Sequence, residues 1–170
     1  INTCILLGLD VEWVYPEFEN GSVIAGKITA EAVESVLVNV EEAACVYITS
    51  PDYLGNIADI KAIAEVCHSY GVPLLVDNAH GAHLAFLEPS QHPIALGADI
   101  CCDSAHKTLP VLTGGAYLHT ASHKYTVKAK EAMSLFGSSS PSYLIMQSLD
   151  LCNKYLAEGF RDDLKKTVQQ

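Results

Sequence analysis

The sequence has few charged residues and almost no arginine. Charged residues make up 18% of the 170-residue chain, and 20 Asp and Glu against 10 Lys and Arg give a formal net charge of −10. Arg161 is the single arginine. Because an acidic chain repels phosphate backbones, and because little arginine is present to contact them, we expect no nucleic acid among its partners.

The sequence also lacks long hydrophobic runs, a leader segment and paired cysteines. Apolar runs such as 72–76 fall far short of the roughly 20 residues that a membrane helix needs, so we expect no membrane contact. No basic and apolar leader precedes a small-residue cleavage site, and a cytoplasmic location is therefore predicted. The six cysteines are irregularly spaced, without a CxxC pair, which favours free thiols in a reducing compartment.

The length and composition are typical of one folded domain. Hydrophobic residues make up 49% of the chain, which is too many for a disordered polypeptide. The chain starts at Ile1 rather than Met, directly in an apolar run. We therefore expect it to be cut from a larger protein.

Short apolar segments alternate with segments of helical periodicity. The strand-like segments are 10–15, 44–49, 73–77, 99–104 and 115–119, and the helical segments are 30–39, 57–70, 122–135 and 143–156. This alternation predicts an α/β fold, a three-layer sandwich around a mostly parallel sheet.

Polar clusters follow three of the predicted strands. They are Ser50–Tyr53, Asp77–His83 and Asp103–Thr108. Ligands of such sheets bind at the carboxyl ends of the strands, so the three clusters together predict one site. Asp52 and Tyr53 have two open interpretations, as part of this site or as a turn.

The second and third clusters suit one particular chemistry. A lysine in apolar surroundings, such as Lys107, can lose its proton and form a Schiff base with a carbonyl. In pyridoxal phosphate enzymes that lysine works with a carboxylate at the pyridinium nitrogen, a role that Asp77 can fill. Ser104 and His106 flank the lysine and can bind the cofactor phosphate.

The motifs DNAHGAH (77–83), SAHK (104–107) and TLPVLTGGAYLH (108–119) resemble the Orn/Lys/Arg decarboxylase family. The resemblance implies a pyridoxal phosphate enzyme with the aspartate aminotransferase-like fold. It makes Lys107 the Schiff-base lysine and Asp77 the pyridinium partner, with both acting in catalysis. It also places Ala79 under the cofactor ring and His80, a third catalytic residue, beside it.

The resemblance further implies an organisation and an assembly. Residues 1–137 correspond to the cofactor-binding large domain without its N-terminal portion, and 138–170 to a helical extension toward a small domain. Ser139 or Ser140 is similar to the family segment that reaches a neighbouring subunit's cofactor, so a homodimer or larger homo-oligomer is expected. The implied reaction, that of a carbon–carbon lyase, releases CO2 from a basic amino acid and yields a polyamine-type amine. Asn78 departs from the family pattern, in which an acid commonly follows the aspartate.

Three alternatives stay open at this point. The chain could serve a related pyridoxal phosphate enzyme, an aminotransferase or a lyase. It could be a metal hydrolase in which Asp77, His80 and His83 bind zinc, although we predict no metal. It could also be a non-catalytic fragment. His92 and His119 have no clustered partners in the sequence, and we expect them to be structural or exposed.

Overall fold

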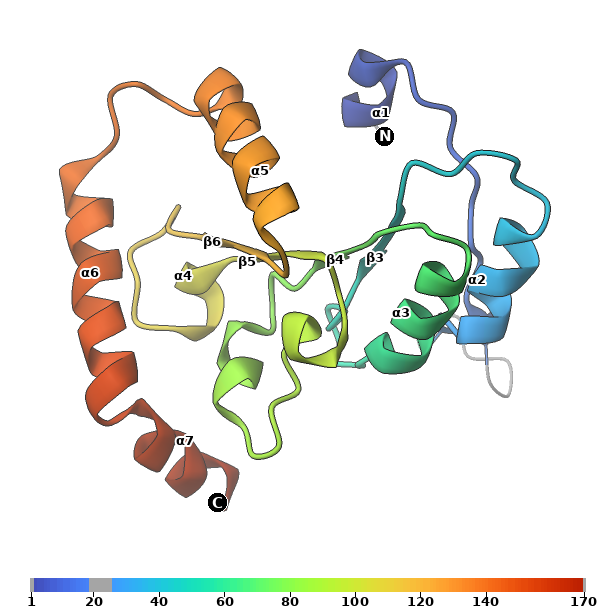
Figure 1. Ribbon diagram of the computed structural model, residues 1–170. Coiled ribbons are helices and arrows are strands. Elements are labelled where there is room, and N and C mark those ends of the chain that lie inside the picture. The colour runs from blue at the N-terminus through green and yellow to red at the C-terminus, as the bar shows by residue number, and fades with distance from the viewer. Residues whose placement is uncertain (1, 19–25, 170) are drawn as a thin grey trace.

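The computed structural model describes residues 2–18 and 26–169 of the chain (Figure 1). The helices are α1 (Asn2–Leu7), α2 (Ala30–Leu37), α3 (Ile60–Ser69), α4 (Ala105–Thr108), α5 (His123–Phe136), α6 (Tyr143–Glu158) and α7 (Phe160–Val168). The strands are β1 (Glu17–Phe18), β2 (Gly26–Lys27), β3 (Val46–Thr49), β4 (Leu74–Asp77), β5 (Ile100–Asp103) and β6 (Tyr117–Thr120). Two short 3-10 helices, η1 (Ala82–Phe86) and η2 (Pro93–Leu96), lie between β4 and β5.

The central sheet has the strand order β3-β4-β5-β6. β3, β4 and β5 run parallel, and β6 runs antiparallel to β5. The register places Thr49 and Cys102 on either side of Asp77 at one end of the sheet. The prediction of an α/β fold with a mostly parallel sheet is confirmed.

Helices α2 and α3 cover one face of this sheet. Each begins at a capping side chain, because Thr29 accepts the amide N–H of Ala32 and Asp59 accepts that of Ala62. Apolar residues at helical spacing then face inward and form one core with the sheet. The core is made of Val33, Leu37, Val46, Ile48, Ile60, Ile63, Ala64, Cys67, Val72, Leu74, Val76 and Ala98.

The opposite face of the sheet is largely exposed in this chain. Tyr47 of β3 is 63% exposed and Leu118 of β6 is 42% exposed. Cys102 of β5 is exposed on the same face, opposite Leu118 in the register. This open face also carries Asp77, because Tyr47, Asp77 and Cys102 alternate with the buried residues of their strands.

A smaller core holds α4 at the end of β5. Ala105 and Leu109 are buried there against Cys152 of α6. Phe86 of η1 contacts Phe160 at the start of α7, with the ring centroids 5.0 Å apart. These contacts fix the short helix that carries Lys107.

Several expectations change with the structure. The strand predicted at 10–15 is wrong, since this segment pairs with no strand among the described residues and its aromatic side chains Trp13 and Tyr15 are exposed. α7 was not predicted. All six cysteines are free, as expected, although only Cys67, Cys101 and Cys152 are buried. Among the described helices, none has the length and apolar character needed to cross a bilayer.

Candidate functional site

Asp77, the last residue of β4, has a fixed carboxylate. Its Oδ2 accepts a hydrogen bond from the Tyr47 hydroxyl at 3.2 Å, and its Oδ1 accepts the Ala79 amide N–H at 3.0 Å. Burial, and then the negative charge of Asp77, raise the pKa of Tyr47 to about 12. The tyrosine therefore stays protonated and keeps donating. Tyr47 was not predicted as a site residue. It lies close to Asp77 only because of the register between β3 and β4, which the sequence does not show.

Lys107 lies in α4, which begins directly after β5. Buried Ala105 and Leu109 anchor the helix, while the Lys107 side chain is exposed. Its Nζ donates a hydrogen bond to Nε2 of His80 at 3.2 Å. In this arrangement His80 accepts at Nε2 and carries its proton at Nδ1. The structure thus brings together Asp77, Ala79, His80 and Lys107, four residues that the sequence predicted for one site.

The two residues of interest in the first polar cluster, Asp52 and Tyr53, have different surroundings. Asp52 closes a turn, since its Oδ1 accepts the amide N–H groups of Leu54 and Asn56. Tyr53 contacts the His80 ring edge-to-face, with the centroids 4.8 Å apart, and is otherwise 90% exposed. The turn interpretation therefore holds for Asp52, and a role of Tyr53 at the site stays a prediction.

Ser104 and His106, the predicted phosphate-binding residues, lie on either side of the start of α4. Ser104 is the N-cap residue of α4 but its side chain makes no capping hydrogen bond. His106 donates from Nδ1 to the Gly115 carbonyl at 3.0 Å, which orients its ring against the loop before β6. A phosphate contact of either residue stays a prediction.

Two residues next to Lys107, its contact His80 and its chain neighbour Thr108, carry buried polar atoms without partners. His80 Nδ1 and Thr108 Oγ1 are both buried and meet no hydrogen-bond partner within the described residues. Such groups are costly unless a ligand or water satisfies them. An amine, a carboxylate, an imidazole and a hydroxyl around the small Ala79 fit pyridoxal phosphate, which the sequence resemblance implies. Thr108 lies in the third predicted polar cluster, but the sequence assigned it no role of its own.

The alternative metal site at Asp77, His80 and His83 does not form in the described residues. The one group of three potential ligands found there is His92, Asp103 and His119, whose ligand atoms all lie within 4.8 Å of one another. The expectation that His92 and His119 have no clustered partners is therefore wrong. Pairing of β5 with β6 places His119 opposite Cys101, on the same face as Asp103.

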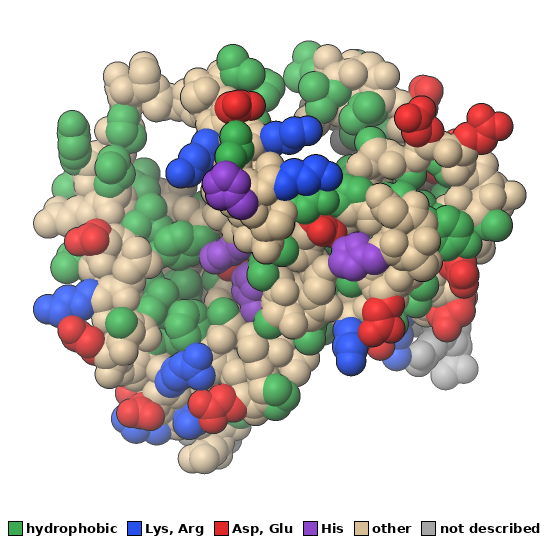
Figure 2. Space-filling view, viewed as in Figure 1, with side chains coloured by type: hydrophobic (Ala, Val, Ile, Leu, Met, Phe, Trp, Pro, Cys, Tyr) green, Lys and Arg blue, Asp and Glu red, His purple; other side chains and the backbone are tan. Residues whose placement is uncertain are grey.

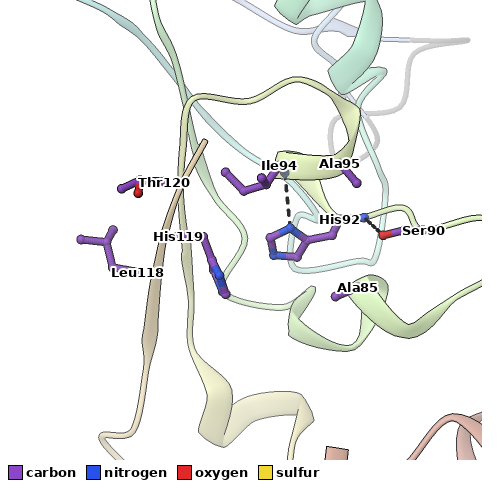
Figure 3. Close-up of a pocket in the computed structure, with 8 residues that line it drawn as sticks. All are labelled: Ala85, Ser90, His92, Ile94, Ala95, Leu118, His119 and Thr120. Atoms are coloured by element: carbon purple, nitrogen blue, oxygen red, sulfur yellow. Dashed lines mark hydrogen bonds between the residues drawn. The ribbon is translucent and has the colours of Figure 1, made fainter. Parts of the chain in front are cut away.

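His92 and His119 also line a shallow surface pocket (Figure 3). The pocket residues are Ala85, Ser90, His92, Ile94, Ala95, Leu118, His119 and Thr120. None of the residues that gather around Lys107 belongs to it. The pocket is thus separate from the predicted cofactor site.

Solved structures support the fold. The chain is similar to a SepCysS protein in complex with the N-terminal domain of SepCysE, with a TM-score of 0.62, 19% identity, and coverage of 85% of this chain and 36% of that one. It is also similar to a Sphingomonas wittichii serine palmitoyltransferase, with a TM-score of 0.59, 18% identity, and coverage of 77% and 34%. At these identities the likeness concerns the fold alone.

Curated relatives are more similar in sequence. The uncharacterized protein YaaO of Bacillus subtilis is 36% identical over 154 residues, which cover 89% of this chain and 32% of the relative. An arginine decarboxylase of Halalkalibacterium halodurans is 34% identical over 171 residues, covering 99% and 35%. The chain therefore spans about a third of the length of these relatives. Residues 5–170 match the major domain of Orn/Lys/Arg decarboxylases, and the chain belongs to that family.

Proposed function

We propose that this chain is the cofactor-holding part of a pyridoxal phosphate-dependent decarboxylase of basic amino acids. The observation that carries the proposal is the contact of Lys107 Nζ with His80, next to an Asp77 carboxylate held by Tyr47. Family membership and the arginine decarboxylases among the relatives support the same reaction. Residues 1–137 and 138–170 then serve as part of the large domain and as a helical extension.

Lys107 would hold the cofactor as a Schiff base at its Nζ. His80 accepts from that amine and so fixes its position between the strand end and α4. Deprotonated lysine is the nucleophilic form, and an acceptor that can also take a proton beside the amine assists its formation. Ala79 leaves room for a ring, since its side chain ends at Cβ.

Asp77 would hold a proton on the pyridine nitrogen of the cofactor. When bound, pyridoxal phosphate supplies an electron sink for the charge left as the substrate carboxylate departs as CO2. A fixed carboxylate stabilises the charged ring without reorganising during the reaction. Tyr47 and the Ala79 amide supply that fixed orientation.

A basic amino acid is the substrate class that this chain's charge suits. The formal net charge of −10 attracts a cationic side chain over long range. The related alternative is a transamination or lyase reaction at the same lysine. The expected cytoplasmic location and homo-oligomer stay predictions.

The proposal is tested with the full-length protein that contains this chain. Release of CO2 and formation of a keto acid are measured with L-arginine, L-lysine and L-ornithine after loading with pyridoxal phosphate. We expect CO2 from at least one of the three and its loss in Lys107→Ala, with Lys61→Ala on the exposed face of α3 as the control. Keto acid without CO2 would identify the transamination alternative instead, and no turnover in any case would overturn the proposal.

A further inference from the structure

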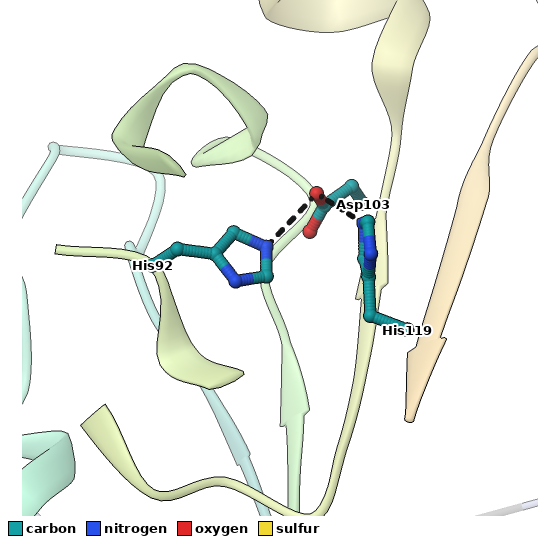
Figure 4. A group of neighbouring side chains, drawn as sticks. All are labelled: His92, Asp103 and His119. Atoms are coloured by element: carbon teal, nitrogen blue, oxygen red, sulfur yellow. Dashed lines mark hydrogen bonds and ion pairs between the residues drawn. The ribbon is translucent and has the colours of Figure 1, made fainter. Parts of the chain in front are cut away.

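A buried carboxylate lies behind the cofactor site, between two histidines (Figure 4). Asp103 ends β5 and is 2% exposed. Its Oδ2 accepts from Nε2 of His92 at 3.1 Å and from Nε2 of His119 at 3.0 Å. His92 caps η2 and His119 belongs to β6, so the three residues join separate elements.

The second oxygen of Asp103 reaches toward the site. Its Oδ1 accepts from Nδ2 of Asn78 at 2.7 Å and from the Cys101 thiol at 3.4 Å. Burial alone raises the pKa of Asp103, but the hydrogen bonds from His119, His92 and Asn78 outweigh it and lower the pKa below its usual range. Asp103 is therefore a buried anion whose two oxygens are both occupied by donors.

Asn78 connects this anion to the segment that carries Asp77, Ala79 and His80. It is fully buried, and its backbone N–H donates to the Cys102 carbonyl at 2.9 Å. The backbone carbonyl of Asn78 accepts the Gly81 amide N–H at 2.9 Å. The side-chain Oδ1 of Asn78 lies so close to Gly81 that a Cβ at position 81 would clash with it. The Asn78 side chain thus packs between Gly81 and Asp103, with its Nδ2 hydrogen-bonded to the Asp103 carboxylate.

We propose that Asp103, held by His92 and His119, is a positioning residue for the Asp77–His80 segment and acts through Asn78. The inference rests on the proposed function for what that segment does. It also explains the departure at Asn78. A carboxylate at position 78 would lie against the Asp103 carboxylate, whereas an amide donates to it, so the acid at 103 requires an amide at 78.

The hydrogen bonds favour this role over a metal site for the same three residues. The Ile94 amide N–H donates to Nδ1 of His92 at 3.3 Å (Figure 3). This leaves the His92 proton on Nε2, which faces Asp103 (Figure 4). A metal-bound histidine instead donates its second ring N–H to an acceptor. The Ile94 amide cannot accept, so the His92 geometry is that of a hydrogen-bond donor to a carboxylate.

The test is a double-mutant cycle in the full-length protein. Asn78→Asp places two carboxylates together, Asp103→Asn alone removes the anion, and the two changes combined restore a donor–acceptor pair in the opposite direction. The first readout, in the protein without cofactor, is hydrogen exchange of the peptide that contains 77–83, compared with a peptide from α7. The second is pyridoxal phosphate binding by absorbance. Asn39→Asp, the same change at an exposed asparagine, is the control.

We expect Asn78→Asp to speed exchange in the 77–83 peptide and to weaken cofactor binding at least about tenfold, a size typical of coupled contacts. In the double variant, both the slow exchange of the 77–83 peptide and the cofactor affinity return most of the way to the wild-type values. Exchange of the α7 peptide stays unchanged in every variant, and Asn39→Asp behaves as the wild type in both measurements. Losses that simply add in the double variant, or exchange that rises equally in α7, would overturn the positioning role. Stoichiometric zinc in the wild type that is lost in His92→Ala would overturn it too.

The two proposals fail in different ways. A wild type that binds no pyridoxal phosphate contradicts the proposed function, while the exchange cycle still decides whether Asn78 and Asp103 hold the segment. A wild type that binds the cofactor, with no coupling in exchange or binding, contradicts the positioning role alone.

Discussion

At the residue scale, Asp77 combines a fixed position with a charge. Both of its oxygens accept hydrogen bonds, from the Tyr47 hydroxyl and the Ala79 amide, so the carboxylate has little freedom to rotate. Within the described residues, by contrast, the Lys107 amine makes a single hydrogen bond, to His80. Asp77 is therefore held by two hydrogen bonds and the Lys107 amine by one.

Asp77→Ala should remove one preorganised electrostatic partner. We expect a loss of about 2–4 kcal/mol of transition-state stabilisation, or roughly 30- to 1,000-fold in kcat. The measurement is steady-state CO2 release by the loaded full-length protein, with Glu34→Ala on the exposed side of α2 as the control. A variant that keeps its rate would show that Asp77 has no role at the cofactor.

Tyr47→Phe tests the support of that carboxylate. Removing the hydroxyl frees Asp77 Oδ2, and we expect kcat to fall by about tenfold, the equivalent of one net hydrogen bond. Thermal unfolding should change little, because Tyr47 is 63% exposed. If kcat and cofactor affinity were both unchanged, Tyr47 would have no part in supporting the Asp77 carboxylate.

The catalytic candidates could be predicted from the sequence because they follow strands directly. Asp77 ends a short apolar run, and Lys107 comes four residues after the end of another. The hydrogen bonds of Tyr47 and Asp103 could not be predicted in this way. Tyr47 donates to Asp77, 30 positions along the chain, and Asp103 accepts from His92, 11 positions before it. Local sequence patterns carry no information on such pairs.

At the element scale, α3 supplies much of the core under the site. Ile63 is fully buried between this helix and the sheet. Ile63→Ala should lower the free energy of unfolding by about 2–5 kcal/mol through lost burial and a cavity. Urea unfolding followed by circular dichroism measures it, with Lys61→Ala on the same helix expected within about 0.5 kcal/mol of the wild type. Equal effects of the two would contradict the packing described.

Asp103 ties β5, β6 and η2 together and makes stability depend on pH. Its folded pKa lies below the unfolded value of about 3.9, so its contribution is present above that value and is lost as the pH falls through the folded pKa. Between pH 7 and pH 3 the wild type should therefore lose more unfolding free energy than Asp103→Asn. Asp150→Asn on α6 should follow the wild type. Parallel curves for all three proteins would contradict an ionised Asp103.

Elements with a buried face were predicted well, and so was α5, which has no buried residue. The segments around Ile63 and Leu74 have clear periodicity because each must match a core. The segment 10–15 has strand-forming Val and Trp residues but pairs with no strand among the described residues, so local propensity gave the wrong structure. α7 carries Phe160, Leu164 and Val168 at helical spacing, but the sequence analysis placed no separate helix there and expected only a helical extension over 138–170.

At the scale of the whole molecule, large hydrophobic side chains remain at the surface (Figure 2). Leu135 and Phe136 at the end of α5 are 80% and 82% exposed, and Tyr143 and Leu144 at the start of α6 are 82% and 68% exposed. The loop that holds Ser139 and Ser140 joins these two ends and is itself exposed. Patches of this kind mark surfaces that other protein covers.

We expect the protein to be a dimer or larger oligomer through this surface. Sedimentation velocity should show that species for the wild type and a shift toward monomer for Phe136→Glu with Leu144→Glu. Val168→Glu, at an exposed apolar residue of α7, serves as the control. A monomeric wild type, or an equal shift in the control, would contradict this assignment of the surface.

The central claim is that Lys107 holds pyridoxal phosphate, and one measurement tests it directly. The full-length protein is incubated with the cofactor, reduced with borohydride, digested and mapped by mass spectrometry. We expect a pyridoxyl group on the peptide that contains Lys107, and no such adduct in Lys107→Ala. A stable adduct on another lysine, or none in the wild type, would contradict it.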